Sequence, residues 1–526
     1  MSATDPGHDT KERTQQPMLA RHRAKENGNV PPTAPTGDKP PAFPLGYKEG
    51  WSQWWAGLSP AVTEHKVLSF IPYLQGPPTH TQTGTQPPSK STSSAQVDRS
   101  PEREAKPVTT STLTDPHGPR RWQSNLVQLA GKDRFLNEFS VERVGESADN
   151  NLVMLHGYGA GLGFFYRNFE PLSRLTGWKL YALDLLGMGR SSRPPFRIAA
   201  KDHQGKISEA ESWFVDSLEE WRIKKGIDRF TLLGHSLGGY MACAYALKYP
   251  GHLNKLILAS PVGIPEDPYA VQASLPEPSE STLQNEFTQS ANESAAPSAA
   301  SNTSATQPPP RKPLPKWLTT LWDANISPFS FVRLAGPLGP RLVSGWTSRR
   351  FSHLDGEQAQ ALHDYSYSLF RQRGSGEYAL AYILAPGAFA RSPLIRRVQG
   401  LGRQWIGQHD APTVDGADRA SGEGLKGQVA RVRETGLPVV FLYGEHDWMD
   451  VKGGYAAAEK IKAEKERAMK EASGEEREKE NGDAKVVVIR KAGHHVYLDS
   501  AEHFNEVVEG EMRDVESRER RLGFQK

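Results

Sequence analysis

Short apolar runs alternate with segments of helical periodicity from residue 122 onward, and this alternation limits the fold more than any other feature of the chain. Several runs are continuously apolar, as expected for strands that are buried on both faces of a parallel sheet. We expect strands at 135–144, 152–155, 180–183, 230–233, 255–259, 439–443 and 486–489, with helices at 209–225, 237–248 and 453–470. The pattern predicts an α/β fold whose mostly parallel sheet is doubly wound, with right-handed crossovers.

The rest of the chain differs from this core in composition. Among 526 residues there are 48 glycines and 40 prolines, and only 37% are hydrophobic, so part of the length is not expected to join a core. An aromatic-rich helical stretch interrupts the alternation where such folds carry a lid. The predicted organisation is a disordered N-terminus at 1–46, a Trp-rich membrane-association segment at 47–75, a disordered linker at 76–121, the first part of the core at 122–265, a lid at 266–436 with a low-complexity insert at 273–310, and the second part of the core at 437–526.

Charge and cysteine content exclude several classes of protein. Lysine and arginine number 64 against 61 aspartates and glutamates, a balance that argues against a dedicated nucleic-acid binder. Cys243 is the only cysteine, which rules out an internal disulfide framework and a multi-cysteine metal site. We see neither an apolar run of about 18 residues, as a bilayer span needs, nor a secretory signal. His446, His494 and His495 lack the spacing of a zinc helix, so we expect no metal and no other cofactor.

The strongest chemical signal is the motif Gly234-His-Ser236-Leu-Gly238, which lies between an expected strand and an expected helix. In a nucleophile elbow, a serine occupies a strained strand-to-helix turn, and flanking glycines let the backbone turn without Cβ clashes. Ser236 is therefore the candidate nucleophile of an acyl-transfer reaction. An ordinary serine in a glycine-rich turn is the alternative interpretation, and further elements of the site weigh against it.

A glycine-rich loop after an earlier strand supplies a candidate oxyanion hole. The loop begins His156-Gly157-Tyr158. In this class of site, one backbone N–H from that loop and one from the residue after the nucleophile stabilise the tetrahedral oxyanion. We assign these two donors to Tyr158 and Leu237. A dinucleotide-binding loop is the rival interpretation, but the acidic residue expected about 20 positions later is not clear.

The acid and the base are expected in the loops that follow the last two strands. Asp447 and Asp450 both follow the first of these strands, and we favour Asp447 because it fits a Gly-x-x-Asp loop. His494 and His495 follow the final strand, and we favour His494 because it lies directly at the strand exit. A carboxylate orients the histidine and stabilises its cation. The order Ser236, Asp447, His494 is the order of nucleophile, acid and base in this class of enzyme.

Three tryptophans, Trp51, Trp54 and Trp55, lie within five residues outside the expected core. Tryptophan favours the boundary between membrane and water, where its ring contacts acyl chains and its N–H stays hydrated. The apolar stretch at 58–73 has a periodicity that suits an amphipathic helix on a lipid surface. We therefore expect a membrane-binding segment here, with docking of the segment on the core as the alternative.

Several longer motifs resemble one subfamily of α/β-hydrolases. They are Asp184-Leu-Leu-Gly-Met-Gly-Arg-Ser-Ser-Arg-Pro194, Phe214-Val-Asp-Ser-Leu-Glu-Glu-Trp-Arg222, Leu232-Leu-Gly-His-Ser-Leu-Gly-Gly-Tyr240 and Ala244-Tyr-Ala-Leu-Lys-Tyr-Pro250. The subfamily contains the lipid-droplet lipase co-activator, the N-acyl-phosphatidylethanolamine lipase and the fungal cardiolipin-specific deacylase. The resemblance covers 47–75, 122–265 and 437–510, and it implies the α/β-hydrolase fold with a helical lid.

The resemblance implies acyl chemistry on a phospholipid at a membrane or lipid-droplet surface. The co-activator branch has Asn at the nucleophile position, whereas this chain keeps Ser236, so a working hydrolase is implied, most like a cardiolipin deacylase that releases a fatty acid and monolyso-cardiolipin. The family's His-x4-Asp motif, here His494 and Asp499, is associated with acyl-CoA-dependent lysophosphatidic acid acyltransferase activity, which is one alternative. A non-catalytic regulator with a lipase partner is another. The implied location is the mitochondrial inner membrane, with the lipid droplet or the cytoplasm as alternatives.

Overall fold

The computed structural model describes residues 44–78, 106–266, 322, 324–386, 388–406 and 432–523. Most of the predicted N-terminus at 1–46 and the whole predicted insert at 273–310 lie outside these residues. All described residues belong to the unit Pro41–Lys526. No helix among them has the length and apolar character needed to cross a bilayer.

A nine-stranded sheet forms the centre of the fold, in the order β1-β2-β3-β5-β4-β6-β7-β12-β13. Its strands are β1 (Val108–Thr109), β2 (Arg120–Gln128), β3 (Phe135–Arg143), β4 (Asn150–Leu155), β5 (Trp178–Leu183), β6 (Phe230–His235), β7 (Leu253–Ala259), β12 (Pro438–Gly444) and β13 (Asp483–Ile489). Pairing is antiparallel from β1 to β5 and parallel from β5 through β4, β6, β7 and β12 to β13. All the strands expected from the sequence are present, and the predicted α/β fold is confirmed.

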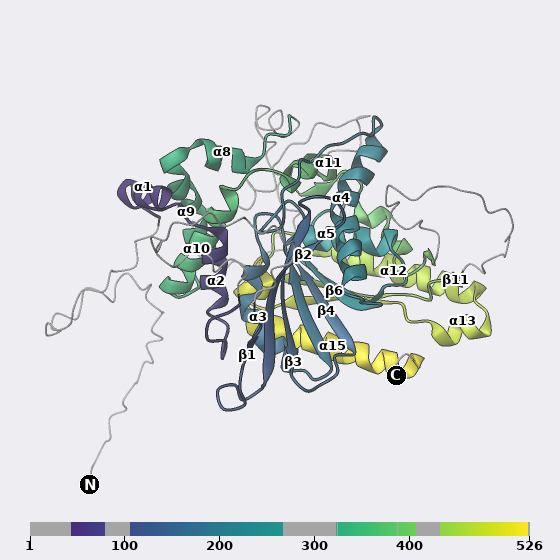
Figure 1. Ribbon diagram of the computed structural model, residues 1–526. Coiled ribbons are helices and arrows are strands. Elements are labelled where there is room, and N and C mark those ends of the chain that lie inside the picture. The colour runs from purple at the N-terminus through teal and green to yellow at the C-terminus, as the bar shows by residue number, and fades with distance from the viewer. Residues whose placement is uncertain are drawn as a thin grey trace, which may run out of the picture. The chain divides into compact units, whose positions relative to one another are not determined.

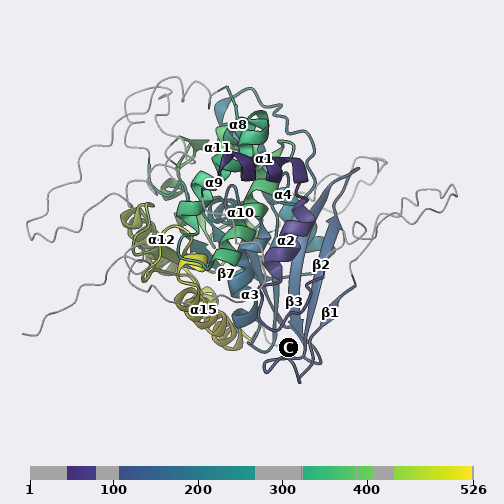
Figure 2. The ribbon, with the colours of Figure 1, turned by 90° about the vertical axis from the view of Figure 1, so that its left-hand side faces the viewer.

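Consecutive side chains along the central strands enter two cores, one on each face of the sheet. Leu232 belongs to the core that includes residues of α4, α5 and α12, whereas Leu233 belongs to the core that includes residues of α3 and α15. These helices are α3 (Tyr166–Leu172), α4 (His203–Lys224), α5 (Leu237–Lys248), α12 (Val451–Glu471) and α15 (Ala501–Leu522), and Figures 1 and 2 show helices on both sides of the sheet. Because both faces are covered, the strands are continuously apolar in sequence.

Further helices lie between β7 and β12, in the interval predicted as a lid. The described elements there are α8 (Pro328–Leu334), α9 (Gly339–Arg350), α10 (Gly356–Phe370) and α11 (Leu380–Ile383), the strands β8 (Leu384–Ala385), β9 (Phe389–Ala390), β10 (Trp405–Ile406) and β11 (Val432–Arg433), and the 3-10 turns η5 (Gly336–Leu338), Gly376–Ala379, Leu394–Arg396 and Val398–Gly400. Asp355 starts α10 by accepting hydrogen bonds from the N–H groups of Glu357 and Gln358. Outside this interval lie the short helices Leu162–Phe165, α13 (Gly474–Lys479) and α14 (Val496–Asp499).

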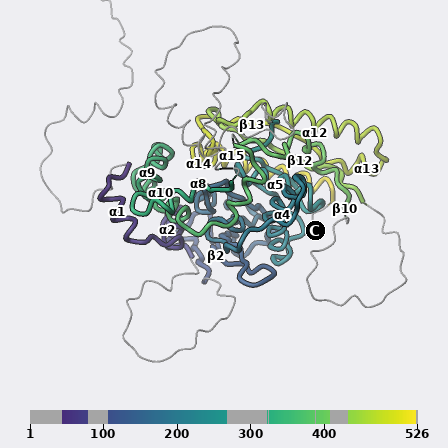
Figure 3. Tube along the Cα trace, turned by 90° about the horizontal axis from the view of Figure 1, so that it is seen from above, coloured from purple at the N-terminus to yellow at the C-terminus, as the bar shows by residue number. Residues whose placement is uncertain are grey.

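The Trp-rich segment docks on these lid helices. Its helix α1 (Tyr47–Ala56) contacts α9, and its helix α2 (Pro60–Leu68) packs against α10. The Gln53 amide donates a hydrogen bond to Asp364, 311 positions further along the chain. Figure 3 shows the purple N-terminal segment beside the green lid helices. The contact between the two segments is therefore part of the fold.

The apolar residues of α2 and of the turn after it face the protein. Val67, Leu68 and Ile71 are each buried and belong to the core on the α3 and α15 side of the sheet. Our expectation that residues 58–73 lie on a lipid surface is therefore wrong. The reason is that burial against the fold already removes this apolar face from water.

The predicted linker at 76–121 contains part of the sheet. β1 lies inside it, and Arg120, the first residue of β2, is completely buried. The Arg120 guanidinium forms ion pairs with Asp115 at 2.7 Å and with Glu170 at 3.0 Å. The polar composition of this stretch concealed its burial, because the charges are neutralised by partners that become neighbours only after folding. The sheet thus begins before the predicted boundary at residue 122.

Candidate active site

Ser236 lies in a sharp turn between β6 and α5. Its φ of 53° and ψ of −115° place it in a region that is strained for a residue with a Cβ. The backbone is held there by a hydrogen bond from the Ser236 N–H to the Ala259 carbonyl oxygen at 2.9 Å. A Cβ on Gly234 would lie 2.3 Å from the Gly238 carbonyl oxygen, and one on Gly238 would lie 2.5 Å from that of Leu155, so glycine is needed at both positions. This is the local geometry of a nucleophile elbow.

The glycine-rich loop after β4 lies against this turn. A Cβ built on Gly157 would come within 3.0 Å of the Ser236 Cβ, so the two backbones approach closely. Leu237 is the first residue of α5. The first N–H groups of a helix have no partner within the helix. The structure therefore brings the loop that carries Tyr158 and the N-terminus of α5 together at Ser236.

His156 fixes the position of the same loop. Its Nδ1 donates a hydrogen bond to the Gly157 carbonyl oxygen at 2.7 Å, and its Nε2 accepts one from the Leu185 N–H at 3.1 Å. Burial lowers the pKa of His156 to about 4, so the ring is neutral at pH 7. Both ring nitrogens are engaged in holding backbone, which makes this histidine a structural residue.

Aromatic rings connect the loop to the lid helices. The Tyr158 ring stacks on Phe329 of α8 with centroids 4.8 Å apart. Phe329 in turn stacks on Phe370 of α10 with centroids 4.4 Å apart. Aromatic packing thus joins the loop beside the nucleophile to the lid.

The two candidate aspartates have different partners. Asp447 Oδ1 lies 3.2 Å from His494 Nδ1, and its side chain is fully buried. Asp450 instead caps α12 by accepting a hydrogen bond from the Lys452 N–H at 3.0 Å. Burial raises the pKa of Asp447, but the charge of His494 and its hydrogen bond outweigh burial, and the pKa lies below its usual value. Asp447 is therefore ionised beside the histidine.

His494 is held by its neighbours on several sides. The Trp448 ring lies 4.9 Å from the imidazole, centroid to centroid. His235 donates a hydrogen bond from Nε2 to the His494 carbonyl oxygen at 3.0 Å. Burial, followed by the charge of His494, lowers the pKa of His235 well below its usual value, so His235 is neutral. His495 packs against Tyr497, with ring centroids 5.9 Å apart.

Asp499 has its own set of partners. Its Oδ2 accepts a hydrogen bond from the Gly493 N–H at 3.0 Å. Its Oδ1 lies 3.7 Å from Arg350 Nη2 and 3.8 Å from His353 Nε2. Neither lid residue is predictable from the sequence, because nothing in the local sequence signals a contact with a loop so far along the chain. Trp448 was not predicted either, although it directly follows the candidate acid.

The three tryptophans of α1 differ in exposure. Trp51 and Trp55 are 56% and 76% exposed, whereas Trp54 is half-buried. Trp54 lies between its two neighbours, with ring centroids 5.9 Å from Trp51 and 6.2 Å from Trp55. The structure therefore leaves two of the three indoles on the surface of the protein.

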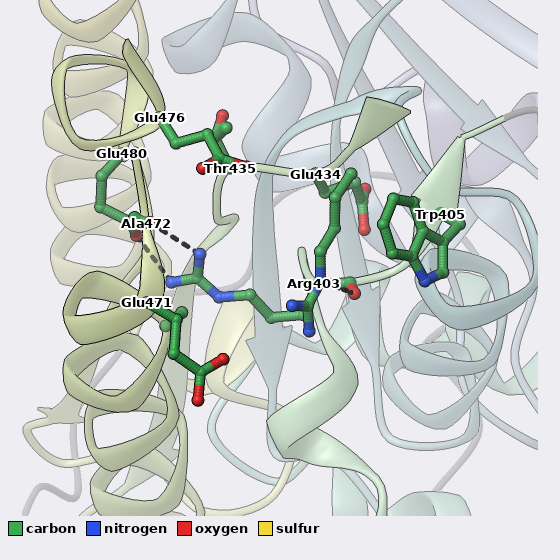
Figure 4. A pocket seen from close by; sticks show the side chains of 10 residues that line it. Arg403, Trp405, Glu434, Thr435, Glu471, Ala472, Glu476 and Glu480 are labelled. Carbon is green, nitrogen blue, oxygen red and sulfur yellow. Dashed lines mark hydrogen bonds and ion pairs between the residues drawn. The ribbon is translucent and has the colours of Figure 1, made fainter. Parts of the chain in front are cut away.

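A separate hollow of about 210 Å³ is shown in Figure 4. Its lining includes Glu434 and Glu480, which shortly precede β12 and β13, and Arg403, whose guanidinium makes two hydrogen bonds of 2.7 Å to Glu480. Parallel α/β sheets carry their reactive loops at the carboxyl ends of the strands, where all the candidate catalytic residues lie. The hollow is thus at the opposite end of the sheet. Within the ranges that the structure describes, no group of three or more His, Cys, Asp or Glu residues is placed to hold a metal ion.

Known proteins of similar sequence include several that are named for lipid chemistry. A 1-acylglycerol-3-phosphate O-acyltransferase of Arabidopsis thaliana is 30% identical over 398 residues, which are 74% of this chain and 71% of that protein. The 1-acylglycerol-3-phosphate O-acyltransferase ABHD5 of Mus musculus is 28% identical over 395 residues, 74% of this chain and 84% of that protein. A (lyso)-N-acylphosphatidylethanolamine lipase of Homo sapiens is 29% identical over 383 residues, 71% of this chain and 83% of that protein.

The family assignment rests on a match to a family model that covers more than half of the chain. Residues 150–501 fit a family model that is described as alpha/beta hydrolase fold. These residues run from β4 through the nucleophile turn and the lid to the loop that carries His494. The predicted resemblance is confirmed by this match and by the lipid-related relatives. The chain belongs to the alpha/beta hydrolase fold family.

Proposed function

We propose that this protein is a serine-dependent acyl hydrolase of phospholipids at a membrane surface, most like a cardiolipin deacylase. The observation that carries the proposal is the strained turn at Ser236 together with the contact of 3.2 Å between His494 and Asp447. Asp447 holds the proton of His494 on Nδ1, which leaves Nε2 as the atom that exchanges protons with the reacting groups.

In the first half of the reaction, His494 Nε2 accepts the hydroxyl proton of Ser236 while Ser236 Oγ bonds to the carbonyl carbon of the acyl ester. The carbonyl oxygen becomes an oxyanion, for which the backbone N–H groups of Tyr158 and Leu237 are the proposed donors. When the carbonyl re-forms, the ester C–O bond breaks and the oxygen of the leaving lysolipid takes the proton from His494. Asp447 stabilises the imidazolium cation throughout.

Water completes the reaction. It gives a proton to His494 Nε2 while its oxygen bonds to the acyl carbon, and the second tetrahedral intermediate then expels Ser236 Oγ. The serine takes the proton back and the fatty acid leaves. If the hydroxyl of a lysophospholipid enters in place of water, the same residues transfer the acyl group to it, so the site also suits transacylation.

Exposed apolar side chains of α1 and the lid support contact with a membrane surface. Trp51 and Trp55 are exposed on α1, and Leu334 and Leu342 of the lid are 85% and 53% exposed. α1 contacts α9 and the turn η5, and Figure 2 shows α1 beside α8 and α9. Adjoining exposed indole and leucine side chains favour the boundary between headgroups and acyl chains.

The names of the relatives support a phospholipid as the substrate. Those names contain an acylglycerol phosphate and an N-acylphosphatidylethanolamine, both of which are phosphate-bearing glycerolipids. The packing of Tyr158 on Phe329 and Phe370 makes the lid apolar beside the loop at Ser236, and apolar surroundings suit an acyl chain. The preference for cardiolipin rests on the resemblance to the fungal deacylase.

An acyl-CoA-dependent lysophosphatidic acid acyltransferase is the second candidate function, because two relatives are named for that activity. It predicts CoA release that depends on His494 and Asp499 but survives Ser236→Ala. The arrangement of these residues weighs against their acting as a pair, since His494 Nδ1 faces Asp447 and Asp499 holds the Gly493 N–H.

A fluorophosphonate probe, which labels activated serines, tests the proposal. We expect the wild type to carry the label on the peptide that contains Ser236, and His494→Ala to lose nearly all of it. Ser392→Ala removes a hydroxyl elsewhere and should label like the wild type. If His494→Ala is labelled as strongly as the wild type and unfolds at the same temperature, a role for His494 as base is contradicted.

Comparison of two esters tests the substrate class. We expect a higher kcat/KM on cardiolipin in vesicles than on a short nitrophenyl ester, because only the lipid has long acyl chains to contact the apolar lid beside Ser236. A strong preference for the short ester would refute a lipid substrate while leaving the serine mechanism intact.

A further inference from the structure

We propose that Arg350, the last residue of α9, binds the phosphate group of the phospholipid while its acyl ester reacts at Ser236. The inference rests on the proposed hydrolase function and adds a headgroup site to it. The residues that carry the argument are Arg350, His353, Arg167 and Asp499, which we call the Arg350 cluster.

The Arg350 cluster lies beside both segments that carry the candidate nucleophile and base. The charge of Arg350 acts on His235, the residue directly before the nucleophile, where it adds to the larger effect of burial in lowering the pKa of that imidazole. Its partner Asp499 accepts a hydrogen bond from Gly493, the residue directly before the candidate base. Asp499 thus joins Arg350 to the loop that carries the candidate base.

The guanidinium of Arg350 has hydrogen-bonding capacity that its neighbours do not use. Its side chain is only 14% exposed, and the separation of 3.7 Å from Asp499 is longer than a hydrogen bond. Within the part of the chain that the structure describes, the buried Nε and Nη2 atoms have no hydrogen-bond partner. A buried charged donor without an acceptor destabilises a fold. An anion bound at these two atoms would supply the missing acceptor.

The two atoms also have the right arrangement for phosphate. Nε and Nη2 lie on one edge of the planar guanidinium, and their N–H groups point in parallel. Two parallel donors match two oxygens of a phosphate group, and this bidentate fit is what distinguishes arginine from lysine at phosphate sites. Arg350 therefore offers a specific contact as well as a charge.

The charges of the cluster favour an anion. Burial lowers the pKa of His353; the charge of Asp499 opposes this, and the charges of Arg350 and Arg167 add to it. His353 is therefore neutral at pH 7. Two guanidinium groups against the single carboxylate of Asp499 leave the cluster with a net positive charge.

The covalent structure of glycerophospholipids explains why such a group belongs near the nucleophile. The phosphate and the nearest acyl carbonyl are separated by only a few bonds along the glycerol backbone. A protein that holds the phosphate therefore also places the ester. Diacylglycerol has the same acyl esters without the phosphate, and inorganic phosphate is the anion without the lipid. Comparison of the two compounds therefore separates the contribution of the phosphate group from that of the acyl esters.

Matched lipids in micelles of a neutral detergent test the site. Phosphatidic acid and diacylglycerol with the same acyl chains are hydrolysed by the wild type, Arg350→Gln, Arg350→Lys and Arg349→Gln. We expect Arg350→Gln to lower kcat/KM for phosphatidic acid about tenfold or more, mainly through KM, and to leave diacylglycerol hydrolysis unchanged. Arg350→Lys keeps the positive charge but lacks the two parallel N–H donors of the guanidinium. Its kcat/KM for phosphatidic acid should therefore lie between the values for the wild type and for Arg350→Gln. Arg349, an exposed neighbour on the same helix, is the matched control.

Several results would overturn the phosphate site. Equal loss on both lipids would show that Arg350 is a contact between lid and core, and no loss on either would show that it is not used. Inhibition by inorganic phosphate that weakens in Arg350→Gln supports a site for the phosphate group itself. Absence of that inhibition, with the lipid selectivity intact, supports a site that takes phosphate only as part of the lipid.

The same assay separates failure of this inference from failure of the proposed function. If Ser236→Ala hydrolyses both lipids like the wild type, the serine mechanism is wrong and the phosphate site beside it is overturned as well. If hydrolysis depends on Ser236 but Arg350→Gln does not discriminate between the lipids, only the phosphate site is overturned.

Discussion

His235 donates a hydrogen bond from Nε2 to the carbonyl oxygen of His494 at 3.0 Å, so the residue before the candidate nucleophile holds the backbone of the candidate base. The bond joins the end of β6 to the loop after β13, two strands that are separated by β7 and β12 in the sheet order. Burial keeps His235 neutral, and the bond to a carbonyl oxygen requires the tautomer that carries its proton on Nε2. The relative position of nucleophile and base thus depends on a residue that does not itself react.

Removing that donor should affect both stability and rate. His235→Ala leaves the His494 carbonyl oxygen buried without its partner, which should lower the free energy of unfolding by about 1–3 kcal/mol. We expect kcat to fall as well, because the hydrogen bond that holds the backbone of His494 is lost. Urea denaturation and ester hydrolysis measure the two effects, with His446→Ala, an exposed histidine, as the control. A variant with wild-type kcat would contradict this role.

The two aspartates of the loop after β12 provide a matched pair of substitutions. Asp447→Asn should lower kcat by about a thousandfold or more, because the amide neither fixes the tautomer of His494 nor stabilises its cation. Asp450→Asn should leave kcat nearly unchanged, because asparagine also caps a helix. Steady-state hydrolysis of one ester by both variants is the measurement. A larger loss in Asp450→Asn would reverse the assignment of the acid.

Glu64 of α2 makes stability depend on pH. Burial raises its pKa, and this outweighs the opposing effect of its ion pair with Arg190. The folded protein therefore holds the Glu64 proton more tightly than the unfolded chain does. As pH rises above 4.5, the ordinary value for this group, the unfolded chain ionises first and the Glu64 contribution to stability is lost.

Urea unfolding across a pH series checks this sign. We expect the free energy of unfolding of Glu64→Gln to improve relative to the wild type as pH rises from about 4.5, since glutamine does not titrate. Glu49→Gln, at an exposed position on α1, should follow the wild type at every pH. A constant difference between wild type and Glu64→Gln over the series would show that Glu64 has an ordinary pKa.

The exposed indoles of α1 should govern binding to vesicles. Replacing Trp51, Trp54 and Trp55 by alanine removes the side chains that favour the membrane boundary, so co-sedimentation with phospholipid vesicles should fall about tenfold or more. Trp405→Ala is the control, because Trp405 is 44% exposed but lies on the hollow at the other end of the sheet. Unchanged co-sedimentation of the triple variant would discard the membrane role of α1.

The candidate site was largely predictable because each of its parts follows a strand. Continuously apolar strands are visible in the sequence, and parallel strands end at a common edge, so the loops with Ser236, Asp447 and His494 were expected to meet. The choice between Asp447 and Asp450 followed from spacing alone. In the structure the first contacts His494 and the second caps α12.

Other features could not be predicted because they depend on contacts between distant segments. β2 is rich in polar residues, and the burial of Arg120 depends in part on Glu170, 50 positions away, which pairs with it only in the folded chain. The segment with α2 is amphipathic in sequence, but its apolar face is covered by lid residues some 300 positions later, where the Thr63 hydroxyl bonds to that of Ser368. The Arg350 cluster has the same origin, since the lid and the loop with Asp499 meet only in the folded chain.

Mass-spectrometric analysis of lipid products tests the central claim most directly. Purified wild type and Ser236→Ala are incubated with vesicles that contain cardiolipin and lysophosphatidic acid, in the presence of acyl-CoA. We predict that the wild type forms monolyso-cardiolipin and free fatty acid and that Ser236→Ala forms neither. Phosphatidic acid and free CoA that appear at the same rate with Ser236→Ala would contradict the serine mechanism and establish the acyltransferase instead.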